Sequence, residues 1–187
     1  MSEPYEIAIL VGSLRKGSFS RRLGDALVKL APDTLTFKYV EIGDLPYYNE
    51  DLETETPPAA WTTFRDAIAP VDGVLFITPE YNRSIPAVLK NAVDVGSRPY
   101  AAGVLNGKPA AIAAQTPGTM GAFGAAHHLR QMLVALGMPT MAHPELYIAK
   151  THELVTEDGN VTNEGTEAFL KSFVDALAVW VGKHKQS

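Results

Sequence analysis

The chain has 187 residues, of which 46% are hydrophobic and 20% are charged. This is the balance of a folded globular protein, and the length suits one domain over residues 1–187. The net charge of -5 argues against nucleic acid and anionic membranes as partners. The absence of cysteine excludes disulfides, thiolate metal sites and a cysteine nucleophile.

The N-terminal residues lack the basic and apolar segments of a secretory signal, and no apolar stretch is long enough to span a bilayer. We therefore expect a cytoplasmic protein without a membrane anchor.

The first predicted strand, 7–11, is a nearly unbroken aliphatic run, which is typical of a parallel strand buried on both faces. A turn rich in glycine and serine separates this strand from a helix that begins near Ser20 and ends at Pro32. Polar and apolar residues alternate over 36–42, which predicts a half-exposed edge strand.

A long loop over 43–58 comes next, and loops of this length are usually functional or part of an interface. Its two tyrosines, Tyr47 and Tyr48, have three possible roles: a dimer contact, a wall of a partner's site, or packing within the loop. Apolar residues at helical spacing over 61–68 then predict a second amphipathic helix.

The second half of the chain continues the alternation. Buried strands are predicted at 73–78 and 110–115, each followed by a loop and a helix, and a weaker strand is predicted at 146–148. The last helix is expected to face the core through Phe169, Phe173, Leu177 and Trp180.

Strands and helices therefore alternate five times, which predicts an α/β fold with a five-stranded parallel sheet and helices on both faces. Ligands of such sheets bind beyond the carboxyl ends of the strands. The loops after the first, third and fourth strands are expected to converge on one site there.

The first of these loops has the composition of an anion site. It contains three hydroxyls, Ser13, Ser18 and Ser20, and the guanidinium of Arg15, and it leads into a helix. The unpaired amides and the dipole of a helix N-terminus favour negative charge.

Several phosphate-binding motifs are absent from this loop. The spacing from Gly12 to Gly17 resembles a Walker A motif, but Ser18 and Phe19 stand where lysine and Ser/Thr are required. The dinucleotide fingerprint fails after Gly12, and no nucleophile elbow of an α/β-hydrolase is present. A single phosphomonoester remains, and flavin mononucleotide (FMN) is the leading candidate for a sheet of this type.

Three segments carry a resemblance to a known family: 12–20 (GSLRKGSFS), 79–82 (PEYN) and 89–94 (LKNAVD). The chain resembles the NADPH-dependent FMN reductases, and within them the bacterial chromate and quinone reductases, which are also described as azoreductase-like. The similarity extends over essentially the whole chain. It implies a flavodoxin-like fold, bound FMN, and a homodimer that commonly pairs into a homotetramer.

The resemblance also implies roles for individual residues. In the first loop the FMN phosphate would be bound by Ser13, Arg15, Ser18 and Ser20, with Phe19 beside them. Along the isoalloxazine and ribityl chain would lie Pro79, Glu80, Tyr81 and Asn82. The opposite edge would be closed by Gln115, Thr116 and Gly118. Glu80 has two alternative roles, capping the next helix or pairing with a cation.

Two further arginines are candidates for the substrate side of the site. Arg83 stands where relatives in the family often have an aromatic residue, so it would change the charge of the substrate face. Arg98 is either a ligand of a pyridine nucleotide or an anion on the substrate side, or the partner of Asp94 in a structural ion pair.

The resemblance implies an FMN-dependent NAD(P)H oxidoreductase that works by ping-pong and reduces quinones, chromate, azo compounds or free flavin. The flavin would carry the chemistry, so no side-chain acid or base is nominated, and no histidine pair has a spacing suited to a metal. The alternatives are a flavodoxin-type electron carrier without its own NAD(P)H turnover, and a flavin-binding scaffold.

Overall fold

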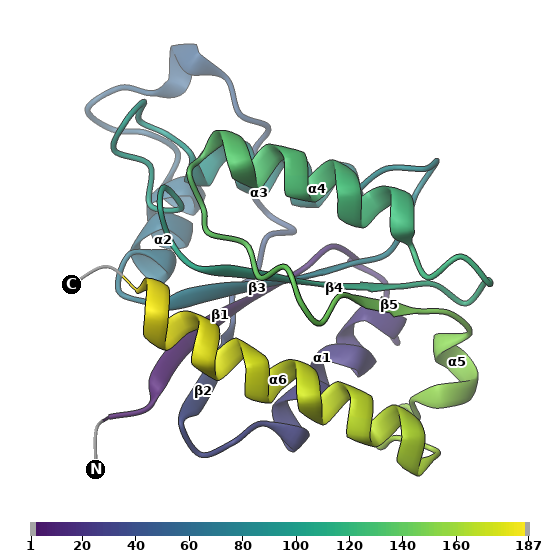
Figure 1. Ribbon diagram of the computed structural model, residues 1–187. Coiled ribbons are helices and arrows are strands. Elements are labelled where there is room, and N and C mark those ends of the chain that lie inside the picture. The colour runs from purple at the N-terminus through teal and green to yellow at the C-terminus, as the bar shows by residue number, and fades with distance from the viewer. Residues whose placement is uncertain (1–2, 186–187) are drawn as a thin grey trace.

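The computed structural model describes residues 3–185, which form a central sheet between two layers of helices (Figure 1). The strands are β1 (Tyr5–Val11), β2 (Leu35–Tyr39), β3 (Gly73–Thr78), β4 (Ala110–Gln115) and β5 (Leu146–Ile148). All paired strands are parallel, in the order β2-β1-β3-β4-β5. This is the flavodoxin-like order, so the predicted fold class is confirmed.

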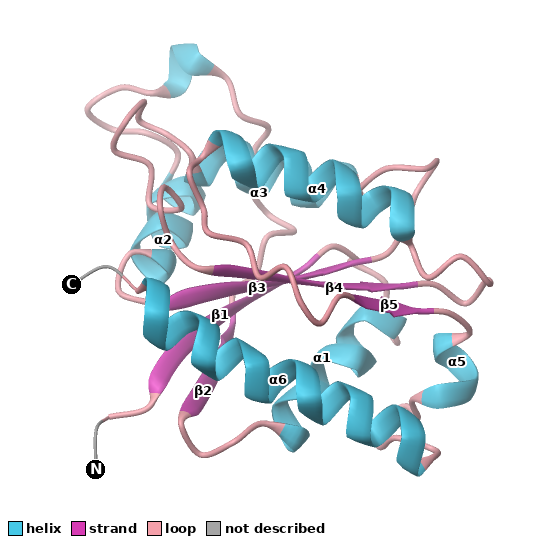
Figure 2. Cartoon of the chain, in the orientation of Figure 1, coloured by secondary structure: helices cyan, strands magenta, loops and turns pink. Residues whose placement is uncertain are grey.

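Helices cover both faces of the sheet (Figure 2). Above it in this view lie α2 (Ala59–Ile68), α3 (Ala87–Gly96) and α4 (Phe123–Ala135). Below it lie α1 (Phe19–Leu30), α5 (Thr151–Leu154) and α6 (Glu164–His184). The four-residue α5 and a 3₁₀ turn, η1 (Glu50–Leu52), are not predicted by the sequence patterns. Within residues 3–185, none of the helices is long and apolar enough to cross a membrane.

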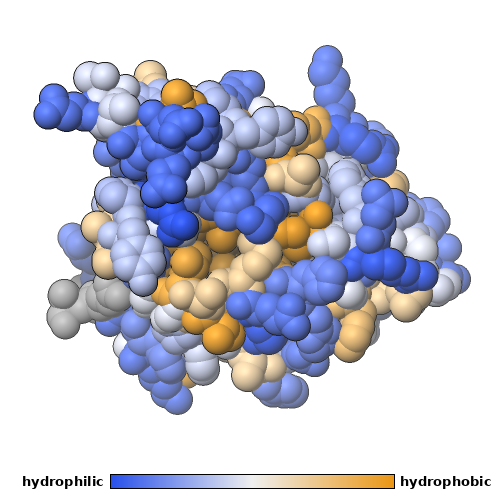
Figure 3. Space-filling view, turned by 90° about the horizontal axis from the view of Figure 1, so that it is seen from above, coloured by the Kyte–Doolittle hydropathy of each residue, from blue (hydrophilic) through white to orange (hydrophobic). Residues whose placement is uncertain are grey.

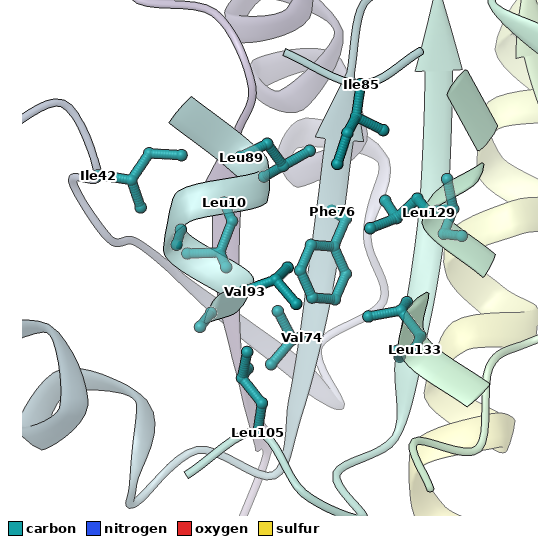
Figure 4. Close-up of a cluster of buried hydrophobic side chains, with 14 of the residues drawn as sticks. Leu10, Ile42, Val74, Phe76, Ile85, Leu89, Val93, Leu105, Leu129 and Leu133 are labelled. Carbon is teal, nitrogen blue, oxygen red and sulfur yellow. The ribbon is translucent and has the colours of Figure 1, made fainter. Parts of the chain in front are cut away.

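The upper core is organised around Phe76 of β3, which is fully buried (Figure 4). Its ring lies between Val93 of α3 and the leucines Leu129 and Leu133 of α4. On the other face, alternate residues of the same strands pack against α1 and α6, because successive side chains of a strand point in opposite directions. Both faces of β3 and β4 are buried, which explains their continuous apolar sequences.

Two sequence expectations about these elements are wrong in detail. The edge strand ends at Tyr39 rather than at residue 42, although the Val40 amide still donates to the Ile9 carbonyl at 3.0 Å. In α6, Phe169 is 38% exposed and the neighbouring Leu170 is buried. Phe173 and Leu177 are buried as expected, and Trp180 is partly buried against the same core, so Phe169 is the residue that leaves the expected stripe.

Three loops leave the carboxyl ends of their strands on the same side of the sheet, toward the right of Figure 1. We call them the first loop (12–18, after β1), the second loop (79–86, after β3) and the third loop (116–122, after β4). The segment that follows α3 lies on the opposite side of the molecule.

Candidate functional site

The first loop is shaped by two glycines. The Gly12 amide donates to the Ile77 carbonyl at 2.8 Å, and a Cβ on Gly12 would lie 3.3 Å from side-chain atoms of Leu89 and Pro79. Gly17 has a φ of +68°, in the left-handed region that glycine adopts without strain. The loop can therefore turn sharply while its backbone stays close to the second loop.

Ser18 ends the loop and starts α1. Its side chain is the N-cap of the helix and accepts a hydrogen bond from the Arg21 amide at 3.4 Å. Ser18 is only 3% exposed, so its hydroxyl is fixed in place. The other amides at the start of α1 point out of the helix end, as in other anion-binding helix N-termini.

A hollow of about 240 Å³ lies beside this loop. Three of the predicted phosphate ligands, Ser13, Arg15 and Ser18, line it together with the cations Lys16 and Arg21 and the carboxylate of Glu41, which pairs with Arg21 at 3.9 Å. The Arg15 guanidinium lies 5.7 Å from the centre of the Phe19 ring, which is a cation–π contact. Hydroxyls, a guanidinium and helix amides together are a donor set that fits a phosphate monoester.

Ser20, also predicted as a phosphate ligand, lies in the core rather than on the open side of the loop. It is fully buried, and its hydroxyl accepts a hydrogen bond of 2.8 Å from Nε2 of Gln115. Gln115 is 2% exposed, and its Oε1 is buried without a partner among the described residues. Two predicted ligands are thus bonded to each other and connect the end of β4 to the start of α1.

The third loop is held by backbone contacts with the end of β5 and the residues that follow it. The Thr116 amide donates to the Ile148 carbonyl at 2.9 Å, and the Lys150 amide donates to the Gly118 carbonyl at 2.8 Å. Within the loop, the Thr116 hydroxyl accepts a hydrogen bond from the Gly118 amide at 3.1 Å. The loop is therefore exposed but anchored at both of its predicted site residues.

The second loop leaves β3 at the buried Pro79 and makes a tight turn. Tyr81 and Ser84 exchange backbone hydrogen bonds of 2.9 and 3.0 Å. The two residues between them, Asn82 and Arg83, have φ values of 52° and 67°, as a type I′ turn requires. The turn carries Tyr81, which is 46% exposed, to the surface of the molecule.

Glu80 fixes the second loop to α4. One carboxylate oxygen accepts from the Ala125 amide at 3.1 Å, and the other accepts from Nη1 of Arg83 at 3.3 Å. The pairing of Glu80 with a cation is therefore confirmed, whereas the expected capping of the next helix, α3, is wrong, because the carboxylate caps α4 instead. The carboxylate compensates for Ala122, the N-cap residue of α4, which offers no side-chain acceptor.

Arg83 lies at the rim of these loops. Its side chain is 71% exposed, and Nη1 also contacts the sulfur of Met120 in the third loop at 2.8 Å. Met120 is itself 58% exposed. A cation and a polarisable thioether therefore connect the second and third loops beside the turn of Tyr81.

Arg98 does not join the other predicted site residues within one chain. It lines a separate hollow of about 330 Å³, and its guanidinium lies 5.8 Å from the ring of Tyr48. The predicted ion pair with Asp94 is wrong, because Asp94 pairs with Lys90 at 2.6 Å, one helical turn earlier. On a helix the i, i+4 pair with Lys90 is well placed, whereas Arg98 follows the end of α3.

For the long loop over 43–58, the packing role is confirmed for Tyr48. Its ring stacks on Trp61 at 5.3 Å, and its amide donates to Oδ1 of Asn91 at 2.8 Å. Tyr47 is 77% exposed. The sequence analysis missed Asn91, a buried residue of α3 that also donates to the Pro46 carbonyl at 3.1 Å. Asn91 is a polar residue within the otherwise largely apolar sequence of α3, and this contrast could have indicated a buried hydrogen-bonding role.

Comparison with known proteins identifies the family to which the chain belongs. Residues 5–153 match the sequence model of a family described as NADPH-dependent FMN reductase. The chain belongs to this family. It is 53% identical over 181 residues to a quinone reductase of Pseudomonas putida, with 97% of each chain covered. It is 43% identical to a 2-hydroxy-1,4-benzoquinone reductase of a Burkholderia species, with 94% of this chain and 96% of that one covered.

Among solved structures, the flavoenzyme NAD(P)H:(acceptor) oxidoreductase FerB of Paracoccus denitrificans superimposes with a TM-score of 0.91 at 44% identity. The match covers 97% of this chain and all of FerB. This NADPH-dependent FMN reductase is therefore an enzyme, an oxidoreductase that uses FMN and NAD(P)H. The first-loop donor set, which fits one terminal phosphate, agrees with that cofactor.

Proposed function

We propose that this enzyme transfers electrons from NAD(P)H to quinones through FMN, by ping-pong. The observation that carries the proposal is the convergence of three loops, one with the donors of a phosphate site, at one edge of a flavodoxin-like sheet. Relatives named as quinone reductases, at 53% and 43% identity, support the acceptor class. When bound, FMN supplies the redox chemistry, and the protein supplies binding and orientation.

In this proposal the first loop holds the phosphate. Ser13 and Ser18 donate hydroxyl hydrogen bonds, and Arg15 donates a charge-assisted one, worth about 1.5–3 kcal/mol. Phe19 holds the Arg15 guanidinium close to the loop by their cation–π contact. Ser20 acts indirectly, because its hydroxyl already bonds to Gln115 and so connects the first and third loops.

The flavin ring would lie between the second and third loops. Tyr81 and Asn82 stand on the exposed turn, and Thr116 and Gly118 form the opposite edge. Pro79 places the second loop against Gly12, while Glu80 fixes it to α4. Backbone amides of these loops would stabilise negative charge that develops on the reduced ring.

Arg83 is our candidate for contact with the acceptor or with the nucleotide. It is exposed at the rim, and its positive charge would attract an anionic acceptor or a cofactor phosphate. Chromate, azo compounds and free flavin remain further predicted acceptors. Arg98 lines a separate hollow with Tyr48 and Tyr100, so we do not assign it this role within one subunit.

We further propose that the enzyme is a homodimer or homotetramer. Seen from above, hydrophobic residues gather in the middle of the hollowed face over α3 and α4 (Figure 3). A hollow of about 650 Å³ beside these helices is lined by apolar residues such as Ile85, Pro86 and Met132 and by polar ones such as Lys90, His128 and Gln131. A surface with an apolar centre and polar residues around it is typical of contacts between subunits. A cytoplasmic location stays a prediction.

Initial rates test the reaction. Purified enzyme with bound FMN is mixed with NADPH or NADH and with a series of quinone concentrations. Parallel double-reciprocal lines and catalytic consumption of the nicotinamide are expected. Intersecting lines would contradict the ping-pong scheme, and no turnover with any acceptor would favour a flavodoxin-type carrier.

A further inference from the structure

Arg22 is a guanidinium of the first-loop region that the residue assignments above do not use. It lies in the second turn of α1, and its side chain is only 16% exposed. Its Nη2 donates to Oε1 of Glu157 at 2.8 Å, and Glu157 belongs to the turn that follows α5. Two segments separated by 135 residues in sequence thus meet at this ion pair.

The Arg22 side chain is directed toward the first loop. Its guanidinium lies 5.0 Å from the centre of the Phe19 ring, the same ring that contacts Arg15 at 5.7 Å. Its Nη2 lies 3.7 Å from the position that a Cβ on Gly17 would occupy. Arg22 therefore packs against both the glycine of the loop and the aromatic residue that follows the N-cap.

Arg22 is only partly satisfied by the protein. Its Nε is buried and has no hydrogen-bond partner among residues 3–185. Buried donors in folded proteins are almost always paired, so the unpaired Nε shows that the protein does not saturate this guanidinium. Because protein atoms cover Nε and Nη2 bonds to Glu157, Nη1 is the nitrogen left to face a ligand.

The charges around the first loop also favour a bound anion. Arg15 and Arg22 share one aromatic ring, and Lys16 lies in the same loop. Of the described carboxylates, only Glu157 forms an ion pair with either guanidinium, and it is 88% exposed. The start of α1 adds the positive end of the helix dipole. A dianion bound in the loop would balance this excess of positive charge.

We propose that Arg22 is a second guanidinium for the FMN phosphate and that Glu157 is its positioning residue. This inference rests on the FMN site proposed above. The planar fork of an arginine suits it to hold a carboxylate with one nitrogen while another faces a phosphate. Glu157 restricts the rotamers of a long side chain, so less entropy is lost when the phosphate binds.

The chain offers a matched control in Lys29. This residue also lies on α1 and also bonds to the turn of Glu157, through the Asp158 carbonyl at 2.5 Å and Oδ1 of Asn160 at 2.8 Å. It stands two helical turns further from the loop. Lys29→Ala removes the same charge from the same helix and loosens the same turn, but leaves the first loop intact.

The test compares FMN with riboflavin, which lacks the phosphate. Flavin-free protein is titrated with each compound, and the quenching of flavin fluorescence gives the two dissociation constants. In Arg22→Ala, FMN binding should weaken roughly 10- to 100-fold while riboflavin binding changes less than about twofold. Arg22→Lys and Glu157→Gln should lose part of the FMN affinity, and Lys29→Ala should keep all of it.

The outcomes separate this inference from the proposed function. A wild-type protein that binds FMN no better than riboflavin refutes both the phosphate site and the role of Arg22. A wild type that prefers FMN, with Arg22→Ala keeping that preference, refutes the role of Arg22 alone. Equal loss of both flavins in Arg22→Ala, or a matching loss in Lys29→Ala, assigns Arg22 to structure only. Should Arg22→Ala fail to fold, Arg22→Lys and Glu157→Gln decide by the same comparison.

Discussion

Nε2 of Gln115 donates a hydrogen bond of 2.8 Å to the hydroxyl of Ser20, across 95 residues of sequence. Both side chains are buried, and they join the end of the fourth strand to the first turn of the first helix. The geometry of the first loop and that of the third loop therefore depend on each other, and a change in one loop should alter the other.

Ser20→Ala should destabilise the enzyme. The substitution leaves Nε2 of Gln115 buried without an acceptor, next to an Oε1 that already has no partner. An unsatisfied buried donor costs about 1–3 kcal/mol, which urea unfolding of the flavin-free protein would measure. The double variant Ser20→Ala/Gln115→Leu removes both polar groups and should recover part of this loss. A Ser20→Ala variant as stable as the wild type would show that this hydrogen bond does not support the loops.

Arg15→Ala should lower the FMN content of the purified enzyme. The variant removes the exposed guanidinium that lines the hollow beside the first loop and contacts Phe19. The loss of one charge-assisted hydrogen bond to phosphate corresponds to about 1.5–3 kcal/mol of binding free energy. The ratio of released flavin to protein measures the effect, and circular dichroism checks that the fold is intact. Full retention of flavin would contradict the assignment of Arg15.

Arg83→Ala should act on the acceptor rather than on the cofactor. Arg83 lies at the rim between the second and third loops, where its charge can attract anions. We expect a change in kcat/KM for the acceptor, largest for an anionic quinone and at low salt, with nearly unchanged FMN affinity. Lys171→Ala on α6 is a matched control, since Lys171 pairs with Asp175 outside the site. The reverse pattern, weaker FMN binding with normal acceptor kinetics, would place Arg83 in the cofactor site.

Glu53→Gln should reveal how the long loop over 43–58 is attached. Two nitrogens of Arg65 bond to the Glu53 carboxylate at 2.7 and 2.8 Å, and these hydrogen bonds hold the pKa of that carboxyl below its usual value. A group with a lowered folded-state pKa stabilises the protein above its unfolded pKa, about 4.3 for glutamate, and loses that contribution as the pH falls through the folded value.

The free energy of unfolding of Glu53→Gln should therefore be about 1–2 kcal/mol lower than that of the wild type at neutral pH. The gap should shrink in acid, because the wild-type carboxyl becomes protonated as well. Urea unfolding of both proteins at a series of pH values measures this difference and its change with pH. A gap that is constant with pH would mean that the charge of Glu53 contributes nothing to the attachment of the loop.

The sequence predicts the fold well because its signals are local. Buried strands such as 73–78 are continuous apolar runs, and the segments around Arg15 and Tyr81 carry their loop chemistry in adjacent residues. In α6 the expected core residues Phe173 and Leu177 are buried, but Phe169 is 38% exposed, because an aromatic residue type alone does not show which residues of the helix end meet the sheet.

The contacts that hold the site loops in place cannot be predicted from neighbouring residues in the sequence. Glu80 caps a helix that begins 43 residues later, and Arg22 meets Glu157 across most of the chain. Nothing in the sequence near Glu80 or Arg22 indicates these partners, since the packing of separate elements creates them. The residue types in each loop were therefore predictable, but the connections that orient the loops were not.

The most direct test of the proposed function is the pair of half-reactions without oxygen. Enzyme with bound FMN is mixed first with NADPH alone and, after removal of the nucleotide, with a quinone alone. The account predicts that the visible absorbance of the flavin falls in the first step and returns in the second, with one quinone consumed per flavin. A flavin that neither NADPH nor NADH bleaches, or that a quinone does not restore, would contradict it.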